Sequence, residues 1–206
     1  SLIGEAGYST MYLPYSVNVE GNSTIPTATG AWTFDNPDDL LNGKGIAKLE
    51  ATKHSKNNVE VTTLSDAGIS VVDGPAKGNG AVLVPKFSSL LMSANNGAEN
   101  MDTYSVLFDV CADDATTYIP LLQNSLTDGK DGSLFINKNQ IGLGGSLKYN
   151  GSIENGKWYR VVFVVQPNGG FLYVDGKLLS GSLSLADAYN KHWKLTTGAL
   201  FFADED

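Results

Sequence analysis

Four aromatic side chains stand among polar residues, and each could hold a sugar. An aromatic ring offers a flat apolar face to a sugar ring, while neighbouring Asn, Asp and Gln side chains can bond its hydroxyls. The candidate rings are Trp193, Tyr149, Tyr118 and Tyr189. The alternative for each is a place in the core or at a hinge, because large aromatic side chains are buried more often than they are displayed.

Hydrolytic chemistry has weaker support. Glycoside cleavage needs two carboxylates that flank the scissile bond. Asp109 lies in an apolar run, but no glutamate stands two or four positions after it. We therefore predict that Asp109 is a hydrogen-bonded structural residue and that the chain is not an enzyme. The rival interpretation is a glycoside hydrolase in which Asp109 acts with Asp113 or Glu154.

The histidines and the cysteine offer no further catalytic group. His54 and His192 lie in polar contexts, with no second histidine at the spacing of a metal ligand, so we predict both as solvated surface residues. Cys111 is the single cysteine and alternates with apolar residues, which predicts a buried, unreactive thiol.

The clearest structural pattern spans residues 157–179, KWYRVVFVVQPNGGFLYVDGKLL. Residues 158–166 are β-branched and aromatic on both alternating faces, which indicates a strand covered on both sides. Residues 167–170 have turn chemistry, and the Asp-Gly pair at 175–176 is a strong signal for a two-residue turn. The stretch therefore predicts three consecutive antiparallel strands, a β-meander.

Several segments resemble the laminin G-like domains of the concanavalin A-like lectin/glucanase superfamily. The resemblance is carried by residues 156–163 (GKWYRVVF) followed by 172–176 (LYVDG), by 31–35 (AWTFD) and by 104–110 (YSVLFDV). It implies an all-β fold, a two-sheet antiparallel jelly-roll sandwich of the concanavalin A-like type, over residues 30–206. The strand at 104–111 is expected to be central.

The resemblance also bears on the site. In laminin G-like folds an acidic loop often lies near a calcium ion, so Asp204 and Asp206 are the predicted metal ligands, with a solvated charged end as the alternative. The hydrolases of the superfamily carry E-x-D-x-x-E, which is missing here. Its alginate lyases carry a Q-I-H strand, whereas residues 140–142 read QIG.

Composition limits the partners. The 206 residues carry a net charge of −8 and only 17% charged side chains, which argues against binding nucleic acid or an anionic membrane surface. No run of 18 apolar residues is present, so we expect no membrane insertion. Glycine, aromatic and β-branched residues favour an all-β class.

The first 29 residues differ from the rest. We predict an N-terminal strand or arm and a linker in 1–29, followed by the jelly-roll domain in 30–206. Laminin G-like domains usually have one more strand after the acidic loop that ends here at Asp206. We therefore expect residues 11–17 to fill that place as a strand, in the same chain or in a strand-exchanged homo-oligomer.

Together these patterns predict a non-catalytic module that binds a carbohydrate or an extracellular protein. The parent would be a secreted or cell-surface bacterial multidomain protein whose signal peptide has been removed. A spacer or interaction domain without a small ligand is the third alternative. Sugar specificity depends on loop conformation, so the sequence does not select a ligand.

Overall fold

The computed structural model describes residues 30–45, 48–55, 58–93, 103–124, 133–143, 146–147, 151–166, 169–179, 193, 195 and 198–202. Over these ranges the chain forms β-strands and a single four-residue helix, α1 (Leu64–Ala67). Every strand pairing among them is antiparallel, as predicted. No helix of this part of the chain has the length and hydropathy needed to cross a membrane.

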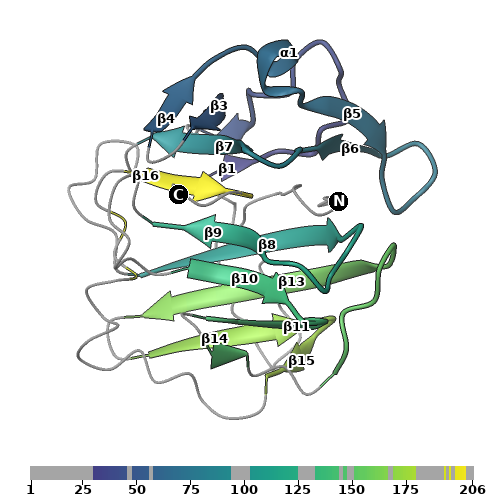
Figure 1. Cartoon of the computed structure of the whole chain (residues 1–206), viewed down its shortest axis with the longest axis vertical. Helices are drawn as coiled ribbons and strands as arrows, with labels where there is room; N and C mark the ends of the chain where they lie inside the picture. Colours follow the sequence, from purple (N-terminus) through teal and green to yellow (C-terminus); the bar gives the residue numbers. More distant parts are fainter. Residues whose placement is uncertain are drawn as a thin grey trace, which may run out of the picture.

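One layer of the molecule is an eight-stranded sheet, called here the large sheet (Figure 1). In spatial order its strands are β12 (Ser146–Leu147), β11 (Gln140–Leu143), β10 (Ser133–Asn137), β9 (Ile119–Gln123), β16 (Gly198–Phe201), β7 (Ser88–Ser93), β3 (Leu49–Ser55) and β4 (Asn58–Val61). β16 comes last along the chain but pairs with both β9 and β7 in the middle of the sheet. The large sheet therefore joins segments that are distant in sequence.

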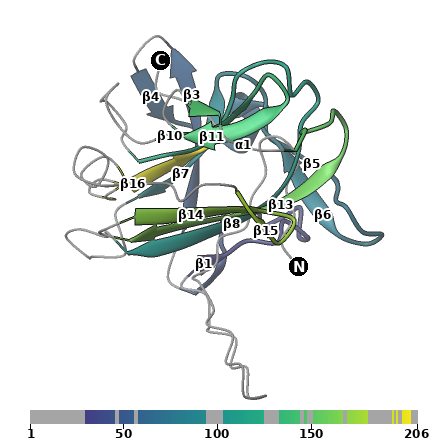
Figure 2. The same cartoon turned by 90° about the horizontal axis from the view of Figure 1, so that it is seen from below.

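The second layer is a four-stranded sheet, called here the small sheet. Its order is β15 (Lys177–Leu178), β14 (Gly169–Val174), β13 (Trp158–Gln166) and β8 (Tyr104–Cys111). The pairs β13–β14 and β14–β15 confirm the predicted meander. Figure 2 looks along the layers, with β8, β13 and β14 below and β3, β10 and β11 above.

Two short hairpins complete the described fold. One joins β1 (Gly30–Ala31) to β2 (Lys44–Gly45), and the other joins β5 (Ser70–Asp73) to β6 (Gly80–Leu83). Between β4 and β5 lies α1, which begins where the Thr63 side chain accepts a hydrogen bond from the amide of Asp66. It ends at Gly68, whose φ of 69° suits glycine.

The core lies between the two sheets because alternate residues of each strand point inward. On β8 the inward residues are Tyr104, Val106, Phe108 and Val110, all of them buried. Across the layers, the ring of Phe108 lies 5.9 Å from the ring of Phe201 on β16. This cluster includes Trp32 and Phe163, whereas Trp158 is only partly buried against it.

β7 lies between β3 and β16, and its backbone is paired with both. β8 was expected in a central position; within the described part of the chain it pairs on one side only, with β13, yet all of its residues are buried. The arm and linker at 1–29, including the strand at 11–17, lie outside the described residues.

Candidate ligand-binding face

The candidate site is the outer face of the large sheet, defined as the face turned away from the small sheet. Strand register identifies its residues. Ala199 and Phe201 of β16 belong to the core, so Leu200 between them points to the outer face. Leu200 is paired with Gln123 of β9 and with Leu91 of β7, which therefore share that face.

The same row continues to β3, where Glu50 is paired with Leu91. Gln123, Leu200, Leu91 and Glu50 thus cross four neighbouring strands on one face, called here the Gln123 row. Gln123, Leu200 and Leu91 are buried, while Glu50 is half-buried. The row places an amide at one end and a carboxylate at the other.

Gln123 is the most unusual residue of this row. Its side chain is 0% exposed, and neither its amide nitrogen nor its amide oxygen has a hydrogen-bond partner in the described structure. A buried polar group without a partner costs about 1–3 kcal/mol. Because such groups are rare in folded proteins, Gln123 is a candidate for a hydrogen bond that forms only when a ligand is bound.

Beside the Gln123 row lies a polar cluster on β3 and β7. The hydroxyls of Thr52 and Ser89, which face each other across the two strands, are hydrogen-bonded to one another. Ser89 Oγ also lies 2.7 Å from His54 Nε2. All three side chains are buried, so the cluster provides polar groups already held in position by mutual hydrogen bonds.

The burial of His54 contradicts the prediction that it is a solvated surface residue. Its exposure is 9%, because β3 lies between β4 and β7 and His54 is bonded to both neighbours through its backbone and its ring. The polar residues around His54 in sequence suggested a loop. Nothing local revealed that β7, more than thirty residues away, would cover it.

An aromatic pair lies at the β9 end of the Gln123 row, on the same side of the row as the polar cluster. Phe135 of β10 points to the outer face, because its neighbours Leu134 and Ile136 are in the core. The ring of Tyr118, just before β9, lies 4.9 Å from the ring of Phe135 at 39°. Tyr118 is 44% exposed, so this predicted ligand residue does present part of its ring to solvent.

Phe135 was not among the candidates from the sequence. It lies in an apolar run with no polar neighbour to mark it, so alternation alone predicts only that it faces one side of a strand. The tertiary structure shows that this side is the outer face and that Tyr118 stacks there.

Trp193 does not fit its predicted role as a ligand residue. Its side chain is 0% exposed, and its ring packs edge to face with Phe163 at 4.8 Å. Its backbone oxygen accepts a hydrogen bond of 2.8 Å from the Tyr104 hydroxyl. Trp193 therefore lies in the hydrophobic core between the sheets, which is the alternative given for it from the sequence.

The other predicted site residues fall outside the described ranges: Tyr149, Tyr189, Asp204 and Asp206. They stay predictions, and so does the calcium site. Among the residues that the structure describes, no group of three or more His, Cys, Asp or Glu side chains is arranged to hold a metal ion.

Asp109 has the structural role predicted for it. Its two carboxylate oxygens accept hydrogen bonds from Nε and Nη2 of Arg160, each 2.7 Å long. Asp109 is buried, and the pair lies on the face of the small sheet turned away from the core. Of its proposed catalytic partners, Asp113 is exposed and Glu154 is bonded to Lys157 at 3.1 Å.

Cys111, on the same strand as Asp109, is buried as expected.

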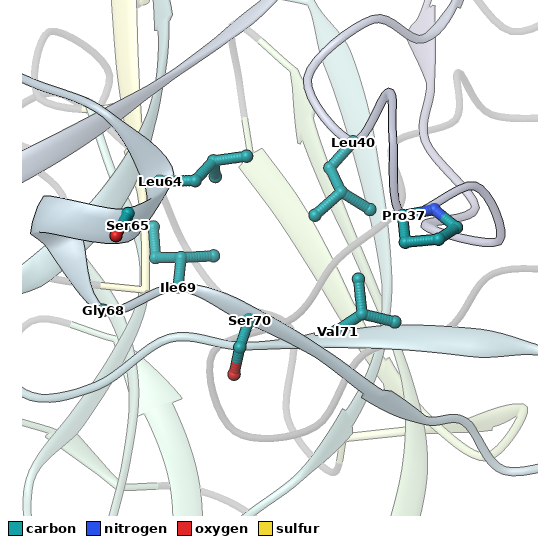
Figure 3. Close-up of a pocket in the computed structure, with 8 residues that line it drawn as sticks. All are labelled: Pro37, Leu40, Leu64, Ser65, Gly68, Ile69, Ser70 and Val71. Atoms are coloured by element: carbon teal, nitrogen blue, oxygen red, sulfur yellow. The ribbon is translucent and has the colours of Figure 1, made fainter.

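A second concavity, of about 460 Å³, lies between the loop after β1 and the segment from α1 to β5 (Figure 3). Pro37, Leu40, Leu64, Ile69 and Val71 supply most of its lining. Among the described residues that line it, none carries a charge, and Ser65 and Ser70 are the hydroxyl side chains. These residues include no titratable group for catalysis and little to orient a polar ligand.

No protein-family model matches the sequence, and no curated protein does. Among solved structures, the fold is similar to domain 4 of AbnA, a GH43 extracellular arabinanase from Geobacillus stearothermophilus, in complex with arabinotriose. The TM-score is 0.61 at 15% identity, over 93% of this chain and 84% of that chain.

Two further likenesses have lower scores. The alginate lyase AlgAT5 of polysaccharide lyase family 7 has a TM-score of 0.41 at 13% identity, over 74% of this chain and 91% of that one. The binding domain of botulinum neurotoxin serotype G has a TM-score of 0.40 at 12% identity, over 76% and 44%. At such identities a likeness concerns the fold alone. Together with the antiparallel two-layer architecture, the match to the AbnA domain confirms the predicted β-sandwich of jelly-roll type.

Proposed function

We propose that this protein is a non-catalytic carbohydrate-binding module that holds its ligand on the outer face of the large sheet. The observation that carries the proposal is Gln123, a fully buried amide whose nitrogen and oxygen have no partner in the described structure. An amide both donates and accepts hydrogen bonds. Sugar hydroxyls do the same, so a sugar would satisfy both atoms of Gln123.

The surroundings of Gln123 supply the other contacts that a sugar needs. Tyr118 and Phe135 form an aromatic surface at the start of β9, and the Thr52, Ser89 and His54 cluster lies on the same side of the Gln123 row, over β3 and β7. Tyr118 and Gln123 are five residues apart, which corresponds to roughly 16–17 Å at about 3.3 Å per residue. This length favours an oligosaccharide over a single sugar unit.

The surroundings of Asp109 argue against the hydrolase alternative. Asp109, the carboxylate that the hydrolase alternative requires, is held by Arg160 on the opposite sheet from the proposed site. The AbnA domain with the same fold was solved with arabinotriose, which agrees with a sugar ligand, and its parent is described as extracellular. We propose likewise that this chain belongs to a secreted or cell-surface bacterial protein of the laminin G-like group.

Affinity electrophoresis in gels containing soluble arabinan, galactan or β-glucan tests the proposal, with the wild type and Gln123→Met compared. Methionine has a similar shape but no hydrogen-bonding amide. We expect Gln123→Met to lose retention by at least about tenfold and to unfold at higher urea, because removing an unpaired buried amide gains about 1–3 kcal/mol. A merely structural glutamine would not combine these two effects.

Tyr118→Ala should also weaken retention, while Phe171→Ala serves as the matched control. Phe171 is an exposed aromatic residue on β14. It belongs to the small sheet and is therefore not part of the outer face of the large sheet. If the wild type is retained by none of the glycans, or if Gln123→Met is retained as well as the wild type, the proposal fails. The protein-binding alternative would then be favoured.

A further inference from the structure

We infer that the outer face of the large sheet takes uncharged glycans, and that Glu50 discriminates against carboxylated or sulfated ones. The inference rests on the proposed function and adds to it the charge class of the ligand. Its basis is the distribution of charge over the eight strands and the chemistry of Gln123.

Titratable side chains on the eight described strands are few: Glu50, Lys53 and His54 on β3, and Glu60 on β4. Strand alternation separates them. Glu50 and His54 share the face of Thr52, which is paired with Ser89, whereas Lys53 points the other way and is paired with Glu60. Lys53, the lysine of these strands, is therefore not on the outer face.

Glu50 lies where a glycan bound at Gln123 would extend. The Gln123 row runs through β9, β16, β7 and β3, which lie side by side in Figure 1. At about 4.8 Å between neighbouring strands, Glu50 is about 14 Å from Gln123 across the sheet. Leu200 and Leu91 lie between them; both are buried, and neither carries a charge.

A charged ligand would be poorly matched to both ends of this row. At Gln123, a carboxylate or sulfate would be removed from water with no cation on the described strand residues of this face to compensate, which is costly, whereas a hydroxyl would both donate and accept. At Glu50, the like charge would repel it. Arg160, the cation with the geometry to bind a carboxylate, is on the small sheet and already holds Asp109.

The experiment compares galactan and β-glucan, each with its derivative oxidised at the primary hydroxyls, which has the same backbone with carboxylates added. Binding of the intact 206-residue chain is measured by affinity electrophoresis at low and at high salt. We expect the wild type to prefer the neutral form by about tenfold or more at low salt, and Glu50→Gln to reduce this preference at least about threefold. High salt should reduce it as well.

Glu60→Gln is the matched control, because it removes one negative charge from the same sheet but from the opposite face. Its preference ratio should equal that of the wild type. Equal or tighter wild-type binding of the oxidised form, or an unchanged ratio in Glu50→Gln, overturns the inference while leaving glycan binding intact. Failure of the wild type to bind either form would instead overturn the proposed function.

Discussion

At the scale of single residues, Tyr104 shows how burial fixes a protonation state. Its side chain is buried between the sheets, and its hydroxyl donates to the backbone oxygen of Trp193 over 2.8 Å. Burial raises the pKa of Tyr104 above its ordinary value, because the phenolate would be desolvated there. The neutral hydroxyl is therefore the form that the folded state requires.

This requirement predicts a loss of stability at alkaline pH. Because the pKa of Tyr104 is raised in the folded state, its contribution to stability is fully present below the pKa that tyrosine has in the unfolded chain, about 10. That contribution falls as the pH rises above this value. Near pH 7, Tyr104→Phe should cost about 1 kcal/mol through the lost hydrogen bond. Above about pH 10, the free energy of unfolding of the wild type should fall by up to about 1.4 kcal/mol per pH unit more than that of the variant.

Urea unfolding of both proteins across this pH range measures the effect. The difference in free energy of unfolding between wild type and Tyr104→Phe should shrink as the pH rises. The other tyrosines ionise in both proteins and cancel in the comparison. A difference that stays constant up to about pH 11 would contradict the role given to Tyr104.

At the scale of elements, the turn between β14 and β15 depends on backbone conformation. Asp175 and Gly176 both have positive φ, 50° and 78°, as a two-residue type I′ turn requires. Asp175 Oδ1 also accepts a hydrogen bond of 2.8 Å from the amide of Arg160, which ties the turn to β13. Here the local sequence and the tertiary contacts favour the same conformation.

Two glycine substitutions should separate backbone strain from steric exclusion. A Cβ at Gly176 would meet nothing within 4 Å, so Gly176→Ala should cost only about 1 kcal/mol for its positive φ. A Cβ at Gly80 would lie 2.1 Å from the backbone oxygen of Phe34, so Gly80→Ala must displace β6. We expect Gly80→Ala to cost about 2–3 kcal/mol.

Gly156→Ala is the matched control for strain, since Gly156 has a φ of 70° and equally open surroundings. Chemical denaturation of the three variants gives the comparison. Equal costs for Gly80→Ala and Gly176→Ala would show that the contact between β6 and Phe34 is looser than the structure indicates.

At the scale of the whole molecule, the aromatic contacts between layers make the two sheets one folding unit. Phe108 of the small sheet contacts the rings of Phe201 and Phe202, each with centroids 5.9 Å away. All three side chains are buried. Because each sheet buries its inner face against the other, neither has an independent core.

Phe108→Ala should therefore destabilise the entire domain by about 3–5 kcal/mol through the lost contacts and the cavity left behind. Unfolding followed by tryptophan fluorescence and by far-ultraviolet circular dichroism should still give coincident transitions. Phe171→Ala, at an exposed position, should change the free energy of unfolding by less than about 0.5 kcal/mol. Separate transitions for the two probes would argue against a single core.

The sequence by itself determined the features that depend on neighbours along the chain. The meander of β13, β14 and β15 followed from β-branched runs and an Asp-Gly turn, and the buried positions of Phe163 and Cys111 followed from alternation. The hydrogen-bonded role of Asp109 followed from the missing carboxylate partner, although Arg160 could not be identified as the group that holds it.

Only the tertiary structure decided the candidate site. Gln123, Leu200, Leu91 and Glu50 come from four strands spread over the chain, and their common face is visible only once β16 lies between β9 and β7. The same reason explains why His54 and Trp193 are buried. Their neighbours in sequence are polar, but burial is set by strands that are distant along the chain and adjacent in the sheet.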